Sequence, residues 1–179
     1  MSYMTIRKRL RTASGATIFA IVAASVTSVY GTAYAAEGNS IAHHLPGVFV
    51  GVTSGGGETD YTLGIEYEYR FNQWFGLGIV GEHTPNRHFG DGVSVALGTI
   101  HYHPFGAWRV TAGYGYEDVH DASLKRSKGK LPTKNEDVIR IGVSYDFHVG
   151  KFGIAPSASV DFVGGKEVGV IGVSLIRPF

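Results

Sequence analysis

The chain has 179 residues, of which 44% are hydrophobic and 17% are charged, and it contains no cysteine. Without cysteine it can have neither a disulfide framework nor a lipid attached to an N-terminal cysteine. Its 16 basic and 15 acidic residues nearly balance, so the charge does not indicate a nucleic-acid partner.

The first 35 residues predict a secretory signal peptide, cleaved after Ala35. Residues 16–30 are mostly apolar, and Ala33-Tyr34-Ala35 has the small-x-small pattern of a cleavage site. Four basic residues and no acidic residue precede them: Arg7, Lys8, Arg9 and Arg11. The apolar stretch is shorter than the roughly 20 residues of a membrane-spanning helix. Removing the segment leaves 12 basic and 15 acidic residues, a net charge of −3.

Beyond the signal, large apolar residues alternate with small or polar ones, which predicts β-strands. In residues 60–71, tyrosine, leucine, isoleucine and phenylalanine at odd positions alternate with threonine, glycine, glutamate and arginine at even positions. Eight such segments are expected, at residues 46–54, 60–71, 73–84, 93–103, 108–119, 137–147, 152–163 and 166–179. Eight is the smallest even number of strands that closes a membrane barrel.

The apolar face of these strands is predicted to point outward, into lipid. The interior of an eight-stranded barrel is just wide enough to be filled by side chains, so it cannot hold the large residues of every strand. The face rich in glycine, serine and charged residues fits inside. A soluble barrel with an apolar interior is therefore excluded on volume.

The expected connections alternate in length, as periplasmic turns and extracellular loops do in outer-membrane barrels. Residues 72–73, 104–107 and 148–151 form short joins, whereas residues 54–59, 85–92 and 120–136 form longer ones. The join at residues 164–165 is the exception, a short external loop.

Large aromatic residues gather where this topology places the periplasmic interface. Amphipathic rings favour the headgroup level of a bilayer, so these residues predict an aromatic girdle. The girdle comprises Tyr69, Phe71, Trp74, Phe75, Phe105, Trp108, Tyr145, Phe147, Phe152 and Phe179. A thinner outer belt is expected from Tyr61, Tyr116 and Phe162.

The export signal, the eight segments and the closing sequence VSLIRPF, residues 173–179, resemble the small outer-membrane barrels, the OmpA, OmpX and OmpW-like domains. The prediction is an all-β, eight-stranded antiparallel transmembrane barrel over residues 45–179, after a short periplasmic segment of residues 36–44. The resemblance implies that Phe179 is offered to the outer-membrane assembly machinery. Arg177 and Pro178 depart from that C-terminal signal.

Charged residues on the inward face are predicted to form a network in the lumen. Its members are Glu66, Glu68, Arg70, Glu82, Arg109, Glu117, Arg140, Asp146 and Asp161. Assuming a regular antiparallel register, Glu117 should lie close to Arg140, and Arg109 close to Asp146. In a narrow dry lumen an unpaired charge is expensive, so opposite charges should pair and plug the barrel. An ion path or proton relay through the same charges is the alternative.

Two histidines, His101 and His103, share one face of the fourth segment, as a metal-binding pair can. Their facing is ambiguous, because Val93, Val95 and Leu97 suggest the opposite orientation and would require a bulge. No third ligand stands at a fixed spacing, so we expect no metal and no other cofactor.

An enzyme of this architecture would have to modify lipid. The lipid A deacylases among these barrels carry a His-x-Ser pair on an outward-facing strand, and the sequence contains no His-x-Ser. Glu82, His83 and Ser94 lie near the outer rim but do not match that motif. A serine hydrolase needs its base within hydrogen-bond reach of its nucleophile, which the sequence does not show. We therefore expect no enzymatic activity.

The longest outer loop, residues 120–136, is basic and is a candidate for contact with lipopolysaccharide phosphates. The basic residues are Lys125, Arg126, Lys128, Lys130 and Lys134. The expected protein is a monomeric outer-membrane barrel of the Gram-negative envelope, in contact with membrane lipid and lipopolysaccharide, with a structural or interaction role. A narrow porin-like channel is the second interpretation, and a lipid A modifying enzyme is the third.

Overall fold

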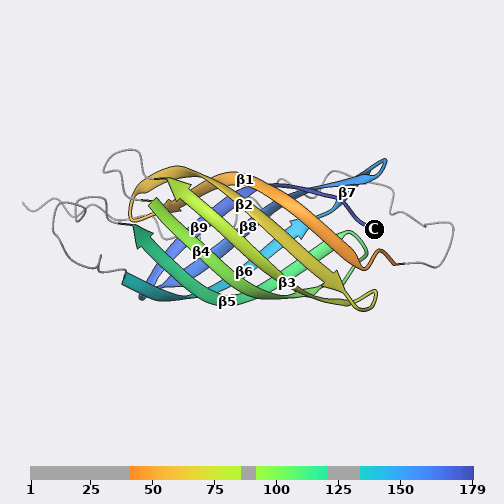
Figure 1. The fold of residues 1–179 in the computed structure, drawn as a ribbon, viewed down its shortest axis with the longest axis horizontal. Coiled ribbons are helices and arrows are strands. Elements are labelled where there is room, and N and C mark those ends of the chain that lie inside the picture. The colour runs from red at the N-terminus through yellow and green to blue at the C-terminus, as the bar shows by residue number, and fades with distance from the viewer. Residues whose placement is uncertain (1–40, 86–91, 121–133) are drawn as a thin grey trace, which may run out of the picture.

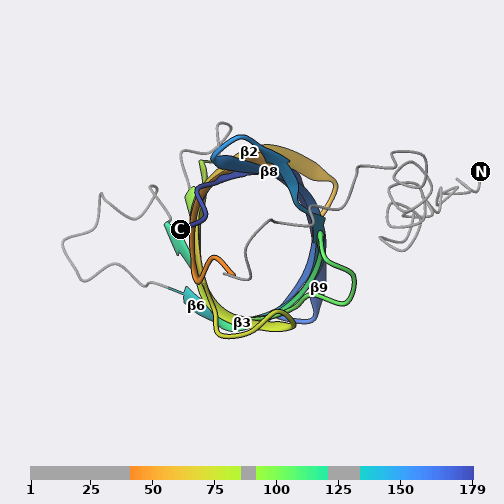
Figure 2. The same cartoon turned by 90° about the vertical axis from the view of Figure 1, so that its right-hand side faces the viewer.

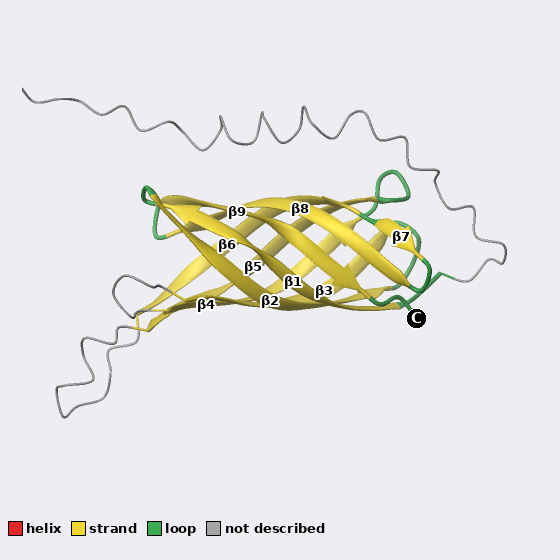
Figure 3. Ribbon diagram, turned by 90° about the horizontal axis from the view of Figure 1, so that it is seen from above, coloured by secondary structure: helices red, strands yellow, loops and turns green. Residues whose placement is uncertain are grey.

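The computed structural model describes residues 41–85, 92–120 and 134–179 of the chain (Figure 1). These residues form an antiparallel sheet whose strands are tilted relative to its long axis (Figure 3). The strands are β1 (His44–Gly55), β2 (Glu58–Arg70), β3 (Phe75–Pro85), β4 (Gly92–Tyr102), β5 (Trp108–His120), β6 (Lys134–Tyr145), β7 (Phe147–Val149), β8 (Phe152–Val163) and β9 (Lys166–Ile176). Within the described ranges, no helix has the length and apolar character needed to cross a bilayer.

The sheet closes on itself, as the end-on view in Figure 2 shows. Each strand from β1 to β5 pairs with the next, both β6 and β7 pair with β8, β8 pairs with β9, and the first strand, β1, pairs with the last, β9, over Gly47–Gly55. The predicted all-β antiparallel barrel is thus confirmed. A closed sheet has no long edge strand: apart from the three-residue β7, the described strands have partners on both sides.

The nine strand elements make eight barrel strands, because β6 and β7 are two pieces of one strand. Ser144 of β6 pairs with Ser157, and Phe147 of β7 pairs with Ile154, so both pieces keep the same register on β8. The interruption lies beside Pro156, which has no N–H to donate to the ladder. Asp146 at the break instead donates its backbone N–H to the carbonyl of Ala107, at 2.8 Å.

Alternation sorts the side chains as expected from the sequence. Outward residues such as Ile65 and Ile79 are 67% and 64% exposed, whereas inward residues such as Thr62 and Ser174 are 1% exposed. The interior therefore takes the small and polar face, and the apolar face covers the outside. An apolar outer surface is stable only where something other than water surrounds it.

The first outer connection is shorter than predicted. Pairing of β1 with β2 continues to Gly55 and Glu58, so only Gly56 and Gly57 form the turn, with φ values of 62° and 91°. Two consecutive positive φ values define the type I′ turn, whose twist matches that of a hairpin. The long outer connections are those after β3 and β5, and residues 86–91 and 121–133 lie outside the described ranges.

Strand β4 is continuous, so the bulge that its sequence suggested does not occur. Every residue from Gly92 to Tyr102 pairs in one register with β3. Val95 and Leu97 therefore point inward, on the same face as His101. Leu97 packs with Val138 and Val163 in a small apolar cluster of the lumen, with Val95 against it. Val95 and Leu97 can face inward because this cluster gives them apolar neighbours inside the lumen.

Glycine at position 115 is required by close strand contact. A Cβ atom there would meet the carbonyl oxygen of Ala96 and lie 2.8 Å from Leu97 Cα. We predict that Gly115→Ala destabilises the folded barrel by about 1–3 kcal/mol, the usual effect of overpacking, measured by urea unfolding in lipid vesicles. Gly98→Ala is the matched control on the neighbouring strand, because its Cβ would meet its nearest atom at 3.9 Å. Equal stability of the two variants would contradict the prediction.

Candidate functional site

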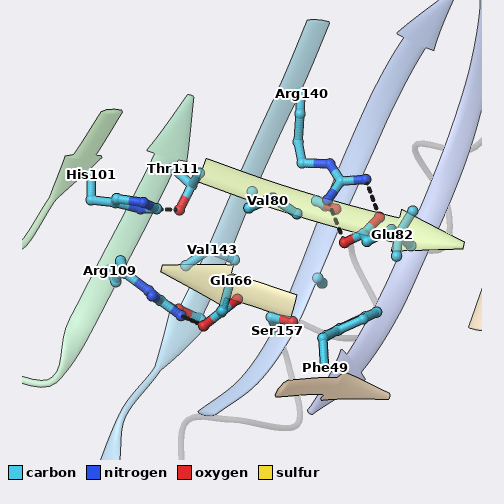
Figure 4. A pocket seen from close by; sticks show the side chains of 15 residues that line it. Phe49, Glu66, Val80, Glu82, His101, Arg109, Thr111, Arg140, Val143 and Ser157 are labelled. Carbon is cyan, nitrogen blue, oxygen red and sulfur yellow. Dashed lines mark hydrogen bonds and ion pairs between the residues drawn. The ribbon is translucent and has the colours of Figure 1, made fainter. Parts of the chain in front are cut away.

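The guanidinium of Arg140, on β6, lies across the part of the lumen nearer the outer end. Its Nε and Nη2 donate to the two carboxylate oxygens of Asp161, at 2.6 and 2.7 Å. Its Nη1 and Nη2 donate to those of Glu82, at 2.6 and 2.7 Å (Figure 4). Asp161 stands on the neighbouring strand β8, but Glu82 stands on β3, separated from β6 by β4 and β5. One arginine therefore ties distant walls of the barrel by two bidentate contacts.

A second charged layer, nearer the periplasmic end, centres on Arg109 of β5. Its Nε donates to Ser144 Oγ at 2.9 Å, and its Nη1 and Nη2 donate to Glu68 and Glu66, each at 3.3 Å. Arg109 is 5% exposed and Glu68 is 1% exposed. The two glutamates belong to β2, so this layer also spans the lumen.

His103 extends the lower layer, just beyond the end of β4. Its Nε2 lies 2.7 Å from a carboxylate oxygen of Glu68, and its Nδ1 lies 3.2 Å from Nη2 of Arg70. A guanidinium can only donate and a carboxylate can only accept. The pattern therefore selects the tautomer with its proton on Nε2, in which the ring bridges Arg70 and Glu68.

His101 points inward and is held by two hydroxyl groups. Its Nε2 lies 2.9 Å from Thr99 Oγ1, and its Nδ1 lies 3.0 Å from Thr111 Oγ1. Among the residues that the structure describes, no group of three histidine, aspartate or glutamate side chains is arranged to hold a metal ion. Both histidines are thus held by hydrogen bonds within the protein.

The predicted pair of Glu117 and Arg140 is wrong. Strands β5 and β6 are offset from the assumed register, so Arg140 lies opposite Gly113, and Glu117 lies opposite Glu136. The connection of residues 121–133 is too long to fix the register by its own turn geometry, so the sequence numbers alone could not give it. Glu117 lies at the outer mouth, away from the Arg140 layer.

Asp146 is inside the lumen and lies close enough to Arg109 for their opposite charges to attract, but the residue directly opposite Arg109 is Ser144 rather than Asp146. Arg109 faces Ser144 across the strands and uses its hydrogen bonds there and on the glutamates of β2. One oxygen of Asp146 lies 3.9 Å from Nη2 of Arg70. The other, Oδ1, is buried and has no hydrogen-bond partner among the described residues. Asp146 therefore faces the arginine at the periplasmic edge of the lower layer.

Two cavities lie along the lumen, and Glu82 lines both. A chamber of about 60 Å³ lies between the two arginine layers and is closed on one side by Phe49 (Figure 4). A wider vestibule of about 290 Å³ opens at the outer end. Six carboxylates and one lysine line this vestibule: Glu58, Asp60, Glu82, Glu117, Glu136, Asp161 and Lys166. Arg140 lines the chamber, and its partners Glu82 and Asp161 line the vestibule, so the Arg140 layer stands where the two spaces meet.

The residues of the predicted girdle surround the periplasmic end. Neighbouring rings touch: Trp108 and Tyr145, across β5 and β6, have centroids 5.1 Å apart, and Tyr145 and Phe147, along one strand, have centroids 4.6 Å apart. Phe75 also contacts Tyr102, at 5.2 Å, a member that sequence reasoning missed. The missed residue follows from the facing of β4, which was ambiguous in the sequence. The remaining predicted members are Tyr69, Phe71, Trp74, Phe105 and Phe152, all exposed.

Phe179 is held at the seam between the two ends of the barrel. Its backbone N–H donates to the carbonyl of His44 at 3.0 Å, and the N–H of His44 donates back at 2.9 Å. The two rings stack with centroids 5.5 Å apart. The predicted signal peptide and the basic residues Lys125, Arg126, Lys128 and Lys130 lie outside the described residues, and Lys134 is the first residue of β6.

One polar pair that sequence reasoning did not find lies on the outside of the barrel. His83 Nδ1 and Ser94 Oγ are 3.0 Å apart on the directly opposed positions of β3 and β4. The sequence showed no base within reach of a serine, because the two residues are separated by a long connection. Only the register of the β3–β4 hairpin brings them together.

The fold is that of small outer-membrane barrels of known structure. Neisserial surface protein A is 12% identical with a TM-score of 0.54, over 76% of this chain and 96% of that one. The Yersinia pestis outer membrane protein Ail in a phospholipid nanodisc is 13% identical, with a TM-score of 0.52, over 75% and 99%. The N-terminal barrel domain of Pseudomonas aeruginosa OprF is 13% identical, with a TM-score of 0.52, over 76% and 98%. No protein-family model and no curated protein sequence matches the chain. At these identities the likeness shows the shared fold.

The layer formed by Arg140, Glu82 and Asp161 should contribute strongly to the free energy of unfolding. Arg140→Ala leaves Glu82 and Asp161 buried without their cation, so we expect a loss of about 3–5 kcal/mol in the free energy of unfolding. The triple variant Arg140→Met, Glu82→Gln, Asp161→Asn removes all three charges and should lose much less. Fluorescence of Trp74 and Trp108 during urea unfolding in vesicles would measure both. An Arg140→Ala variant as stable as the wild type would show that the layer does not hold the walls.

Proposed function

We propose that this chain is an integral outer-membrane protein of a Gram-negative envelope, exported with a cleaved signal peptide, whose lumen is plugged. Its role is structural or interactional and belongs to the surfaces that it presents. The observation that carries this proposal is the pair of buried arginine layers, each of which joins opposite walls. A lumen filled in this way serves the stability of the barrel.

The outer surface supports insertion in a membrane. Exposed apolar side chains cover the strands between the periplasmic girdle and the outer belt of Tyr61, Tyr116 and Phe162. Tyr69 and Tyr61 stand eight residues apart on β2, which is about 20 Å along the membrane normal at ~3.3 Å per residue and a ~40° tilt. That distance suits the apolar band of an outer-membrane barrel, about 25 Å tall.

The outer face is the part that we assign to recognition. The sequence between β5 and β6 carries Lys125, Arg126, Lys128 and Lys130, and these two strands meet at the outer end of the barrel, where Val119 pairs with Lys134. Cationic side chains can replace divalent cations as the counter-charge of those phosphates. Lipopolysaccharide contact through this loop is therefore the interaction that we propose.

A narrow channel is the second candidate, because the vestibule and the chamber lie in line along the lumen. The acidic vestibule would favour cations in such a path. The Arg140 layer and the Arg109 layer both stand across it, however, so conduction requires two sets of buried ion pairs to open. This requirement makes the plugged barrel the better interpretation.

Single-channel recording distinguishes the two candidates. For the plugged barrel we predict no discrete openings from the wild-type protein or from Arg140→Ala in a planar bilayer, because the Arg109 layer still closes the variant. Folding of both proteins is checked beforehand by their heat-modifiable gel mobility. Steady openings of the wild type, with a conductance that Arg140→Ala alters, would overturn the plug and make Arg140 a gating or selectivity element.

The loop hypothesis is tested by removing its charge. Replacing Lys125, Arg126, Lys128 and Lys130 with glutamine should weaken binding to lipopolysaccharide at least about tenfold at low salt, since each cation near an anionic surface contributes about 1 kcal/mol. Co-sedimentation with lipopolysaccharide aggregates measures the binding. The control is Lys151→Gln, which removes a cation from the periplasmic turn between β7 and β8. Unchanged lipopolysaccharide binding by the fourfold variant would contradict the hypothesis.

A further inference from the structure

The pair of His83 and Ser94 lies on the membrane-facing side of the barrel. On β3, His83 shares its face with Leu77 and Ile79, which are 53% and 64% exposed. On β4, Ser94 shares its face with Ile100, which is 57% exposed. His83 is exposed and Ser94 is half-buried. The hydrogen bond of 3.0 Å between imidazole and hydroxyl is thus formed on the outside, not in the plugged lumen.

The height of the pair can be counted from the girdle. Phe75 and His83 stand eight residues apart on β3, as Trp108 and Tyr116 do on β5. Eight residues correspond to about 20 Å along the membrane normal. His83 therefore lies at the level of the outer aromatic belt, where the headgroups of the outer leaflet meet their acyl chains. Ester linkages of membrane lipids lie at this boundary.

The position of the His83 imidazole depends on a glycine in the neighbouring strand. A Cβ atom on Gly92 would come within 2.8 Å of Cε1 and 3.3 Å of Nε2 of His83, so glycine leaves the space in which the ring lies. On the membrane side of Ser94, the outward residues of β4 are the small Ala96 and Gly98. Beside them on β5, Tyr114 and Tyr116 are 54% and 56% exposed. Small residues on β4 and exposed tyrosines on β5 thus stand side by side below the serine, a combination that suits contact with an acyl chain.

We propose that Ser94 and His83 are the nucleophile and the base of an acyl-transfer centre, acting on an ester-linked acyl chain of an outer-leaflet lipid. A serine hydroxyl is a weak nucleophile unless a base within hydrogen-bond reach takes its proton. His83 Nδ1 stands in that position. The inference replaces the expectation of no enzymatic activity, which rested on the apparent lack of such a pair, and it leaves the lumen its structural role.

The reaction divides into two balanced steps. Ser94 Oγ attacks the ester carbonyl carbon while its proton passes to His83 Nδ1, and the proton is then delivered to the leaving oxygen as the ester bond breaks. The products of this step are an acyl-serine and a lipid with a free hydroxyl. Water from the interface then attacks the acyl-serine, with His83 again as base, which releases a fatty acid and restores the hydroxyl.

Covalent labelling tests the nucleophile directly. We expect a fluorophosphonate probe to modify Ser94 in the folded protein in vesicles, with the modified residue located by mass spectrometry. His83→Ala should slow the labelling about 100-fold or more, the usual contribution of a general base, and Ser94→Ala should abolish it. The matched control is Ser54→Ala, because Ser54 lies at the outer rim but pairs with the hydroxyl of Thr59, at 3.0 Å. Failure of the folded wild type to label, or equal labelling of His83→Ala, would overturn the proposal.

Fatty-acid release tests the substrate class. The protein is incubated with vesicles of glycerophospholipid that carry a labelled ester-linked chain, and separately with vesicles that contain labelled lipopolysaccharide. Release from either, lost in Ser94→Ala and retained in Ser54→Ala, supports the assignment and shows which lipid supplies the ester. Labelling of Ser94 without release from either vesicle would overturn the lipid ester as substrate. None of these outcomes depends on conductance or on the basic loop.

Discussion

The guanidinium of Arg140 is the contact on which the interior depends. Eight strands enclose a lumen too narrow for water to solvate charges freely, so each buried charge must find its partner inside the protein. Arg140 satisfies this constraint with two carboxylates at once, one on the adjacent strand and one on a distant strand. Small residues, Phe49 and Arg109 then narrow the space next to it to a chamber of about 60 Å³. The plugged lumen that we propose would therefore result from the pairing of buried charges as much as from packing.

The charged residues inside the barrel and the candidate functional groups on its outer surface have different roles. Inside the lumen, Arg140 and Arg109 donate to carboxylates and His103 bridges Arg70 and Glu68. One oxygen of Asp146, at the periplasmic edge, has no hydrogen-bond partner among the described residues. The outer surface carries the aromatic girdle and the pair of His83 and Ser94, and the contacts with other molecules that we propose are assigned to the outside of the barrel. A fold shared with other small barrels at 12–13% identity does not decide among such features, because function lies in the site and not in the architecture.

Period-two alternation predicts the strands and their facing from the sequence, because the volume of the lumen leaves only one orientation for the large residues. The predicted segment of residues 108–119, for example, becomes β5 with bounds Trp108–His120. What alternation cannot give is the register between strands joined by long connections. The error in placing Glu117 and the failure to see that His83 meets Ser94 have this one cause. Strand β4 was ambiguous for another reason, since valine and leucine fit both lipid and a small apolar cluster inside the lumen.

The mutual backbone hydrogen bonds of His44 and Phe179 join the first and last strands, so the hydrogen-bond ladder runs around the barrel as a closed ring. In an open sheet, the outermost strand frays first and its amides exchange with solvent before those of the centre. Here, opening any one pairing leaves two unsatisfied edges within an apolar medium, where unpaired backbone groups are expensive. Exchange of the strand amides should therefore proceed through a single collective opening. The lifetime of the folded barrel is then set by the height of that barrier rather than by the balance of individual contacts.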